Sequence, residues 1–234
     1  MLANAVASDS SDIVFLLDVD NTLLDNDRII EDLRAHLRHE FDAECAAGYW
    51  EIFEALRREL GYADYLGTLQ RYRRLMEHSA THLHQLLQMS AFLIDYPFAD
   101  RLYPGALNVI EHLSDFGPTV ILSDGDVVFQ PRKVRRSGLW DAVQGRVLIY
   151  EHKELMLTAV EQLYPARHYV MVDDKVRSLS AMKSILRDRL TTVFPRQGHY
   201  AFDMTEISAY PSPDITIDAI GDIGAIEEQR WRSP

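Results

Sequence analysis

The chain has 234 residues, a formal net charge of −12, 47% apolar residues and one cysteine, Cys45. These values fit a folded protein with one large domain, or one domain that carries an insertion. The acidic balance argues against nucleic acid as the main partner, because contact with a phosphate backbone normally needs a concentrated basic surface. A single cysteine forms no internal disulfide, so a reducing compartment is the simpler interpretation.

The first twelve residues, MLANAVASDSSD (1–12), lack the basic start and long apolar stretch of a signal peptide, and we expect them to form a loose tail. No apolar run approaches the roughly 20 residues that are needed to cross a bilayer. We therefore expect a cytoplasmic protein without a membrane partner. The sequence does not indicate an oligomeric state.

Six short apolar runs predict the strands of one sheet. The first, IVFLL at 13–17, is apolar throughout, which is typical of a strand buried on both faces. Helical patterns separate the later runs, and this alternation predicts an α/β fold with a Rossmann-like parallel sheet and helices on both faces. The later runs are TVILS at 119–123, RVLIY at 146–150, YVMVD at 169–173, TTVF at 191–194 and DITI at 214–217, and the helical patterns cover about 106–116, 129–137, 153–163 and 178–188.

About 70 residues of helical pattern, 27–96, interrupt this alternation after the first strand. Asp27 is expected to cap the first inserted helix, and Gly48 or Gly61 to end the helical stretches that follow. We therefore predict an inserted all-helical domain at 27–96 and an α/β core domain at 13–26 and 97–234. Aromatic residues at helical spacing favour a packed core of the insertion over a substrate pocket; they are Tyr49, Trp50, Phe53, Tyr62, Tyr65 and Tyr72.

Polar and charged side chains stand at the ends of four predicted strands. Because ligands of open α/β sheets bind at the carboxyl ends of the strands, these side chains are expected to meet. Their charges predict a cation site beside an anion site. They are Asp18 and Asp20 after the first strand, Ser123, Asp124 and Gly125 after the second, Lys153 after the third, and Asp173 with Asp174 at the end of the fourth.

Each motif also has a simpler explanation. The acids of the first motif suit turns and helix caps, where Asp and Asn are common. A calcium loop of the EF-hand kind is disfavoured, because Leu23 and Ile29 stand where that loop needs glycine and glutamate. Lys153 taken alone is more often a solvated helix residue. The four motifs in order favour a site over these separate explanations.

The stretches DVDNTLLD and LSDG, the isolated Lys153 and the stretch VDD resemble the four ordered motifs of the haloacid dehalogenase-like (HAD) hydrolases. The helical insertion resembles the C1 cap of that family, and the resemblance covers nearly the whole chain beyond the tail. It implies that Asp18 is a nucleophile that attacks phosphorus and forms an aspartyl-phosphate. It also implies that Asp20, on the same side of an extended chain, is the general acid and then the general base, a role that needs a proton at neutral pH.

The same resemblance implies a divalent cation. A carboxylate that approaches a phosphate meets like-charge repulsion of about 4 kcal/mol at about 4 Å and an effective dielectric near 20. Oxygen ligands favour Mg²⁺ as the ion that offsets this repulsion. The expected ligands are Asp18, the backbone carbonyl of Asp20, Asp174 directly and Asp173 directly or through water.

The remaining motif residues are expected to bind the phosphoryl group. Lys153 would supply positive charge to the nucleophile and to the phosphate. The hydroxyl group of Ser123 and backbone N–H groups near Asp124 and Gly125 would donate hydrogen bonds to phosphate oxygens. Asp124 departs from the neutral residue that is common at this place, and we expect it to point outward or to meet a polar or cationic part of the substrate.

The resulting hypothesis is a Mg²⁺-dependent phosphatase that acts on a small phosphorylated metabolite. One alternative is a 2-haloacid dehalogenase, in which an aspartate attacks carbon without a metal, but members of that kind generally lack the second acid, here Asp20. A phosphomutase is a further alternative, as is a phosphonatase, which needs a lysine from the cap, and 27–95 contains none. A non-catalytic binding protein that keeps the fold belongs to a third class. The substrate itself is not readable from the motifs.

Overall fold

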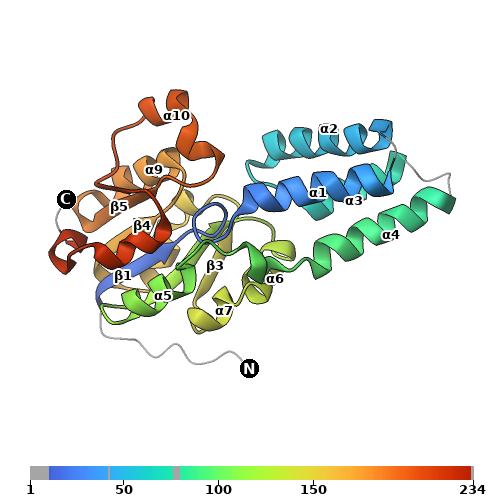
Figure 1. Cartoon of the computed structure of the whole chain (residues 1–234). Helices are drawn as coiled ribbons and strands as arrows, with labels where there is room; N and C mark the ends of the chain where they lie inside the picture. Colours follow the sequence, from blue (N-terminus) through green and yellow to red (C-terminus); the bar gives the residue numbers. More distant parts are fainter. Residues whose placement is uncertain (1–10, 42, 76–79, 233–234) are drawn as a thin grey trace.

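A single six-stranded sheet organises the chain, as expected from its apolar runs (Figure 1). The computed structural model describes residues 11–41, 43–75 and 80–232. Each neighbouring pair of strands is parallel, and the strand order is β3-β2-β1-β4-β5-β6. Because β2 and β4 lie on opposite sides of β1, a crevice forms at the carboxyl end of β1. The strands are β1 (Ser11–Leu17), β2 (Thr119–Asp124), β3 (Val147–Tyr150), β4 (Ala166–Val172), β5 (Leu190–Pro195) and β6 (Ile215–Ile217).

Helices cover both faces of the sheet. Successive side chains of β1 point to opposite faces, so each face contributes apolar side chains to a different cluster. Phe15 and Leu17 join an apolar cluster with residues of α5, α6 and α7, whereas Val14 and Leu16 join a second cluster with residues of α8 and α9. The Rossmann-like prediction is thereby confirmed. The helices of this part are α5 (Ala106–Ser114), α6 (Phe129–Arg136), α7 (Leu139–Ala142), α8 (Leu157–Leu163), α9 (Val176–Leu186) and α10 (Met204–Ser208), with short 3-10 helices η1 (Phe98–Arg101), η2 (Lys153–Leu155), η3 (Arg187–Arg189), η4 (His199–Phe202), η5 (Ile220–Ala225) and η6 (Glu228–Trp231).

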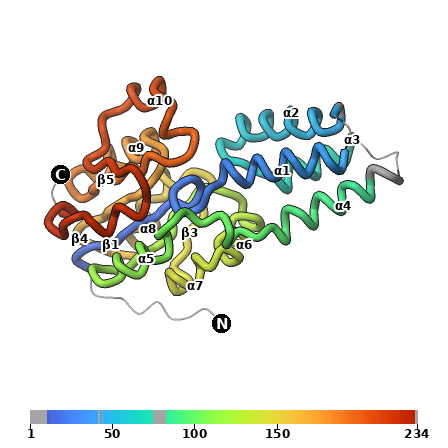
Figure 2. The backbone as a smooth tube through the Cα atoms, viewed as in Figure 1, coloured from blue at the N-terminus to red at the C-terminus, as the bar shows by residue number. Residues whose placement is uncertain are grey.

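Four further helices form what we call the helical unit: α1 (Asn26–Glu40), α2 (Ala43–Leu60), α3 (Tyr65–Leu75) and α4 (Ala80–Asp95). They extend together away from the sheet, beginning where β1 ends (Figure 2). Tyr49 and Tyr72 are buried inside the unit, in agreement with the predicted aromatic core. The unit contacts α6 through Tyr65, whose ring centroid lies 5.3 Å from that of Phe129. This contact fixes one side of the helical unit against the sheet domain.

Several local predictions need correction. The N-cap of α1 is Asp25, whose carboxylate accepts from the backbone N–H of Arg28, and Asp27 is free for a contact elsewhere. Gly48 lies inside α2 and does not end a helix. Gly61 directly follows the last residue of α2 and has a φ of +81°.

The tail and one helix start also differ from expectation. β1 begins at Ser11, inside the segment that was expected to be a loose tail, and 1–10 lie outside the described residues. Lys153 begins the 3-10 helix η2, and the α-helix that follows starts only at Leu157. None of the described helices combines the length and apolarity needed to span a bilayer.

Candidate active site

Three buried carboxylates meet at the carboxyl ends of β1 and β4. Asp18 follows β1, while Asp173 and Asp174 follow β4, and each of the three offers an oxygen within 4.8 Å of the others. The strands bring them together because Leu17 pairs with Val172, directly before the acids. Asp18 is 3% exposed and Asp173 and Asp174 are 0% exposed, so water contributes little to their solvation.

Burial dominates the charge state of this cluster. It raises the pKa of Asp18 to about 6, although the nearby Lys153 ammonium acts in the opposite direction. It also raises the pKa of Asp174 well above the ordinary value for an aspartate. For Lys153, burial acts to lower the pKa, but the charges of Asp173 and Asp18 outweigh it, so the pKa is raised and the side chain stays an ammonium. The result is a buried cation near Asp18 and Asp174, two acids that bind protons more readily than usual.

Lys153 connects two of the acids directly. Its Nζ lies 2.5 Å from Oδ1 of Asp18 and 2.8 Å from Oδ2 of Asp173. The side chain is 0% exposed and lies beside Asp18, where the sequence analysis expected a positive charge. Asp124 supports this lysine from the backbone side, since its Oδ1 accepts from the N–H of Lys153 at 2.8 Å. Asp124 therefore does not simply point outward; it anchors the start of η2.

The acids leave several oxygens without a hydrogen-bond donor. Among the described residues, Oδ2 of Asp18 and both side-chain oxygens of Asp174 are buried and have no such partner. Buried polar atoms without partners are rare and need an explanation. A cluster of hard oxygen atoms at this spacing suits a divalent cation such as Mg²⁺. Both free oxygens of Asp174 agree with its expected role as a direct ligand.

The loop after β1 holds Asp174 in place. Asn21 adopts a φ of +60°, a left-handed conformation that Asn tolerates better than most residues. This turn brings Thr22 next to the carboxyl end of β4, where its Oγ1 accepts a hydrogen bond from the backbone N–H of Asp174 at 3.0 Å. Asp18 is tied to the same strand, because its N–H donates to the carbonyl of Val172. The first motif thus positions both the nucleophile candidate and the acids opposite it.

The second motif is arranged differently from expectation. Ser123 is 1% exposed, and its Oγ accepts from Nε2 of Gln130 at 3.1 Å. The N–H of Gly125 donates to the carbonyl of Tyr150 at 2.9 Å and is therefore engaged in the sheet, not free for a phosphate oxygen. Gly125 has a φ of +156°, and a Cβ there would lie 2.9 Å from the side chain of Gln130. The lack of a side chain at Gly125 leaves room for Gln130, which donates a hydrogen bond to Ser123.

The partner of Asp20 is Lys133, which was not among the predicted site residues. Nζ of Lys133 lies 2.7 Å and 2.9 Å from the two carboxylate oxygens, and it also donates to Oδ1 of Asn26 at 3.1 Å. Lys133 is 1% exposed although it stands in the very basic stretch FQPRKVRR. The available signal was helical spacing, since Phe129 and Lys133 share one face of α6. Asn26 begins α1, so this cluster also connects the acid to the helical unit.

A small cavity of about 60 Å³ lies beside these groups, between the helical unit and the sheet domain. Asp20 and Asp124 line it, together with residues of α1, α2, η4 and the loop that follows α2. Phe53 and Tyr62 also line it, so two of the aromatic residues expected in a packed core face a cavity. Lys175 lines it as well; burial acts to lower its pKa, but the acids led by Asp174 outweigh this and raise it.

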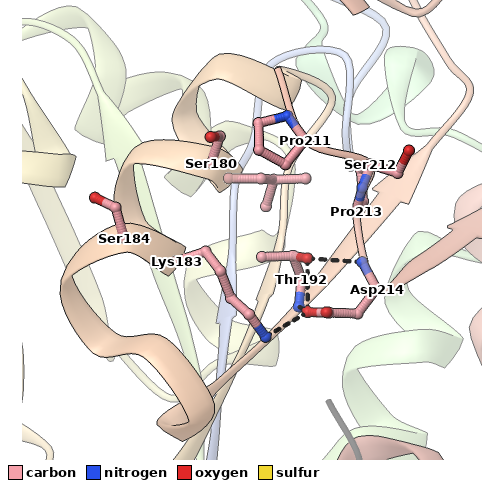
Figure 3. Close-up of a pocket in the computed structure, with 9 residues that line it drawn as sticks. Ser180, Lys183, Ser184, Thr192, Pro211, Ser212, Pro213 and Asp214 are labelled. Carbon is pink, nitrogen blue, oxygen red and sulfur yellow. Dashed lines mark hydrogen bonds and ion pairs between the residues drawn. The ribbon is translucent and has the colours of Figure 1, made fainter.

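A larger pocket of about 270 Å³ lies between α9 and the segment before β6 (Figure 3). Its charged groups satisfy one another. Oδ2 of Asp214 accepts from Nζ of Lys183 at 2.9 Å and from Oγ1 of Thr192 at 2.8 Å. These bonds fasten the entry to β6 and leave no unpaired charge for a ligand, so the acidic cluster is the better candidate for chemistry.

Comparisons with known proteins found one matching family model and several similar solved structures. A family model of the haloacid dehalogenase-like hydrolases matches residues 14–185. The chain is similar to a solved structure described as a haloacid dehalogenase-like hydrolase from Burkholderia xenovorans LB400, with 66% identity over 93% of this chain and 99% of that one and a TM-score of 0.88. No curated protein matches the chain.

Two more distant structures share the fold. The HAD-hydrolase YfnB from Bacillus subtilis, solved with bound magnesium, is 18% identical over 92% of this chain and 97% of its own, with a TM-score of 0.58. An L-2-haloacid dehalogenase from Xanthobacter autotrophicus is 16% identical over 91% of this chain and 96% of its own, also with a TM-score of 0.58. At these identities the likeness concerns the fold alone.

Proposed function

The chain belongs to the haloacid dehalogenase-like hydrolases, and on this premise we propose that it is a Mg²⁺-dependent phosphatase that hydrolyses a small phosphorylated metabolite. The observation that carries the proposal is the buried cluster of Asp18, Asp173 and Asp174, with carboxylate oxygens that lack donors. Such a cluster is costly without a cation. Asp18, Asp174 and Asp173 would hold Mg²⁺ together with the backbone carbonyl of Asp20, and the bound ion would offset the charge of the phosphoryl group.

Asp18 acts as the nucleophile in this proposal. With a pKa of about 6, its carboxyl group is mostly ionised above pH 7. One carboxylate oxygen forms a bond to phosphorus while the bond from phosphorus to the leaving oxygen breaks, which gives an aspartyl-phosphate. Lys153, 2.5 Å from Oδ1 of Asp18, supplies positive charge beside the reacting atoms. Ser123 donates its hydroxyl hydrogen to a phosphate oxygen, held in place by Gln130.

Asp20 moves the protons. It gives a proton to the leaving oxygen, and then takes one from the water that attacks phosphorus and breaks the bond to Asp18. Lys133 fixes the orientation of the Asp20 carboxylate through hydrogen bonds to both oxygens.

The helical unit serves as a C1-type cap in this proposal. It contributes α2 to the wall of the cavity of about 60 Å³ beside Asp20. A space of this size excludes most water from the reacting groups and favours small substrates over phosphorylated proteins. Movement of the helical unit would admit the substrate and release the product.

The first experiment is a phosphatase assay with the purified protein and Mg²⁺ on p-nitrophenyl phosphate and a panel of sugar phosphates, nucleotides and phospho-acids. We expect phosphate release that EDTA stops and Mg²⁺ restores. Asp18→Asn should abolish turnover and keep the circular dichroism spectrum, whereas Asp12→Asn, an exposed change on the same strand, should leave activity intact. Undiminished activity of Asp18→Asn would remove the proposed nucleophile.

The principal alternative is a dehalogenase, and it is tested in the same samples. A 2-haloacid dehalogenase would release halide from 2-chloropropionate without a metal, and Asp20 would have no role in it. Metal-independent halide release without phosphate release would therefore contradict the phosphatase proposal. Failure on every substrate would favour a non-catalytic protein that keeps the fold.

A further inference from the structure

We propose that Arg57 binds a carboxylate of the substrate, so that the protein acts on short phosphorylated carboxylic acids. This inference rests on the proposed phosphatase function and adds the substrate class to it. The observation behind it is that Arg57, in the last turn of α2, lines the cavity beside Asp20.

The cavity is lined from both parts of the molecule. Asp20, Asp124 and Lys175 come from the sheet domain, and the acids Asp174, Asp18 and Asp173 hold the charge of Lys175. Arg57 comes from the last turn of α2 in the helical unit. A substrate whose phosphoryl group lies at the acids therefore meets a second cation in the same cavity, supplied by the helical unit.

Most charges around the cavity are already matched within the protein. The carboxylate of Asp20 pairs with Lys133, and the carboxylate of Asp27 accepts from the backbone N–H of His199 at 2.7 Å and lies 2.6 Å from its ring nitrogen Nδ1. Arg57 differs. Among the described residues, no carboxylate oxygen lies within 4.0 Å of its guanidinium nitrogens.

The hydrogen bond of Arg57 across the cavity goes to a neutral group. Its Nη2 donates to the hydroxyl oxygen of Tyr200 in η4, and the guanidinium lies 5.9 Å from the centre of that ring. Arg57 is half-buried, so its guanidinium has lost part of its hydration without gaining an anion. Arginine presents a planar fork of N–H donors that matches a carboxylate with two parallel hydrogen bonds. The cation is therefore left with donors for an anionic ligand.

The size of the cavity restricts that ligand. A volume of about 60 Å³ lies far below the roughly 300 Å³ of sites for larger ligands. The helical unit must therefore move to admit a phosphate ester, and a chain of two or three carbons requires less movement than a nucleoside or a hexose. The geometry points to short phosphorylated hydroxy acids.

The test compares two esters that differ only at the group proposed to meet Arg57. In 3-phosphoglycerate this group is a carboxylate, and in glycerol 1-phosphate it is a neutral hydroxymethyl group. The readout is the ratio of kcat/KM for the acid to kcat/KM for the neutral ester. We expect the wild-type ratio to exceed about 10 and Arg57→Met to lower it by roughly 10- to 100-fold, mainly through KM for the acid. Arg58→Met is the matched control, since Arg58 is exposed on the same turn and should keep the wild-type ratio.

Binding measured without turnover separates this inference from the proposed function. In the Asp18→Asn background, calorimetry should show tighter binding of 3-phosphoglycerate than of glycerol 1-phosphate, and addition of Arg57→Met should remove the difference. Equal binding of the two esters, or an unchanged ratio in Arg57→Met, would overturn the carboxylate site. Preferential binding of the acid without phosphate release from any ester by the wild type would instead support the site and contradict the phosphatase proposal.

Discussion

Replacement of Asp18 by asparagine should stabilise the metal-free protein while it abolishes turnover. Burial raises the pKa of this group from 3.8 to about 6. A raised carboxyl pKa means that the folded protein binds the proton more tightly than the unfolded chain does. The associated stability is therefore complete below about pH 4 and is lost as the pH rises through about 6. An asparagine side chain at this position carries no charge at any of these pH values, so the variant avoids the loss.

The expected magnitude follows from the pKa difference. The difference between 3.8 and about 6 is about two units, and each unit corresponds to about 1.4 kcal/mol, which gives about 3 kcal/mol at pH 7.5. At pH 5 the folded carboxyl group is mostly protonated, and the expected gain falls to about 1.5 kcal/mol. For a chain of this length, about 3 kcal/mol corresponds to a rise in Tm of roughly 6 to 12 °C.

The assay is thermal or urea unfolding of wild type and Asp18→Asn in EDTA at pH 5 and pH 7.5. The stability gap should roughly double between the two pH values. Asp12→Asn, whose side chain is 61% exposed at the other end of β1, should change stability by less than about 0.5 kcal/mol at both. A variant no more stable than wild type at pH 7.5, or a gap independent of pH, would refute the assignment of the cost to burial of an ionised Asp18.

Three further predictions concern the metal, the second motif and the acid–base pair. Mg²⁺ should raise the Tm of wild type through binding to the folded state and should not raise that of Asp174→Asn; an equal rise in both would exclude Asp174 as a ligand. Gly125→Ala places a Cβ 2.9 Å from the side chain of Gln130. The substitution should raise KM for the phosphate ester and lower the free energy of unfolding in urea by about 1–3 kcal/mol. An unchanged KM would contradict the role given to this glycine. Lys133→Met leaves Asp20 unpaired and half-buried and should cost about 1–3 kcal/mol, and unchanged unfolding in urea would show that the pair contributes nothing to stability.

The sequence was most informative about the strands and the residues directly after them. IVFLL predicts β1 because a run without polar positions suits a strand covered on both faces. The parallel sheet then brings every motif that follows a strand to one edge, so Asp18, Lys153, Asp173 and Asp174 are found together as expected. Placement of these four residues requires only the order of strands and helices along the chain.

The contacts made by helices and loops depend on tertiary packing. Helical spacing shows that α6 has two faces, but the stretch FQPRKVRR offers four basic residues, and only packing selects Lys133 as the one that turns inward to Asp20. The engaged N–H of Gly125 depends on its pairing partner in β3, the carbonyl of Tyr150, which is distant in the chain.

The α/β architecture and the identity of the acids at the sheet edge can be read from the amino-acid sequence, because both follow from local periodicity and strand order. The position of Arg57 in the same cavity as Asp20 comes from the folded structure alone, since these residues belong to separate parts of the chain. Their proximity depends on how the helical unit packs on α6, through contacts such as Tyr65 with Phe129. Packing between distant segments sums many small contacts, and no local pattern in the sequence records that sum.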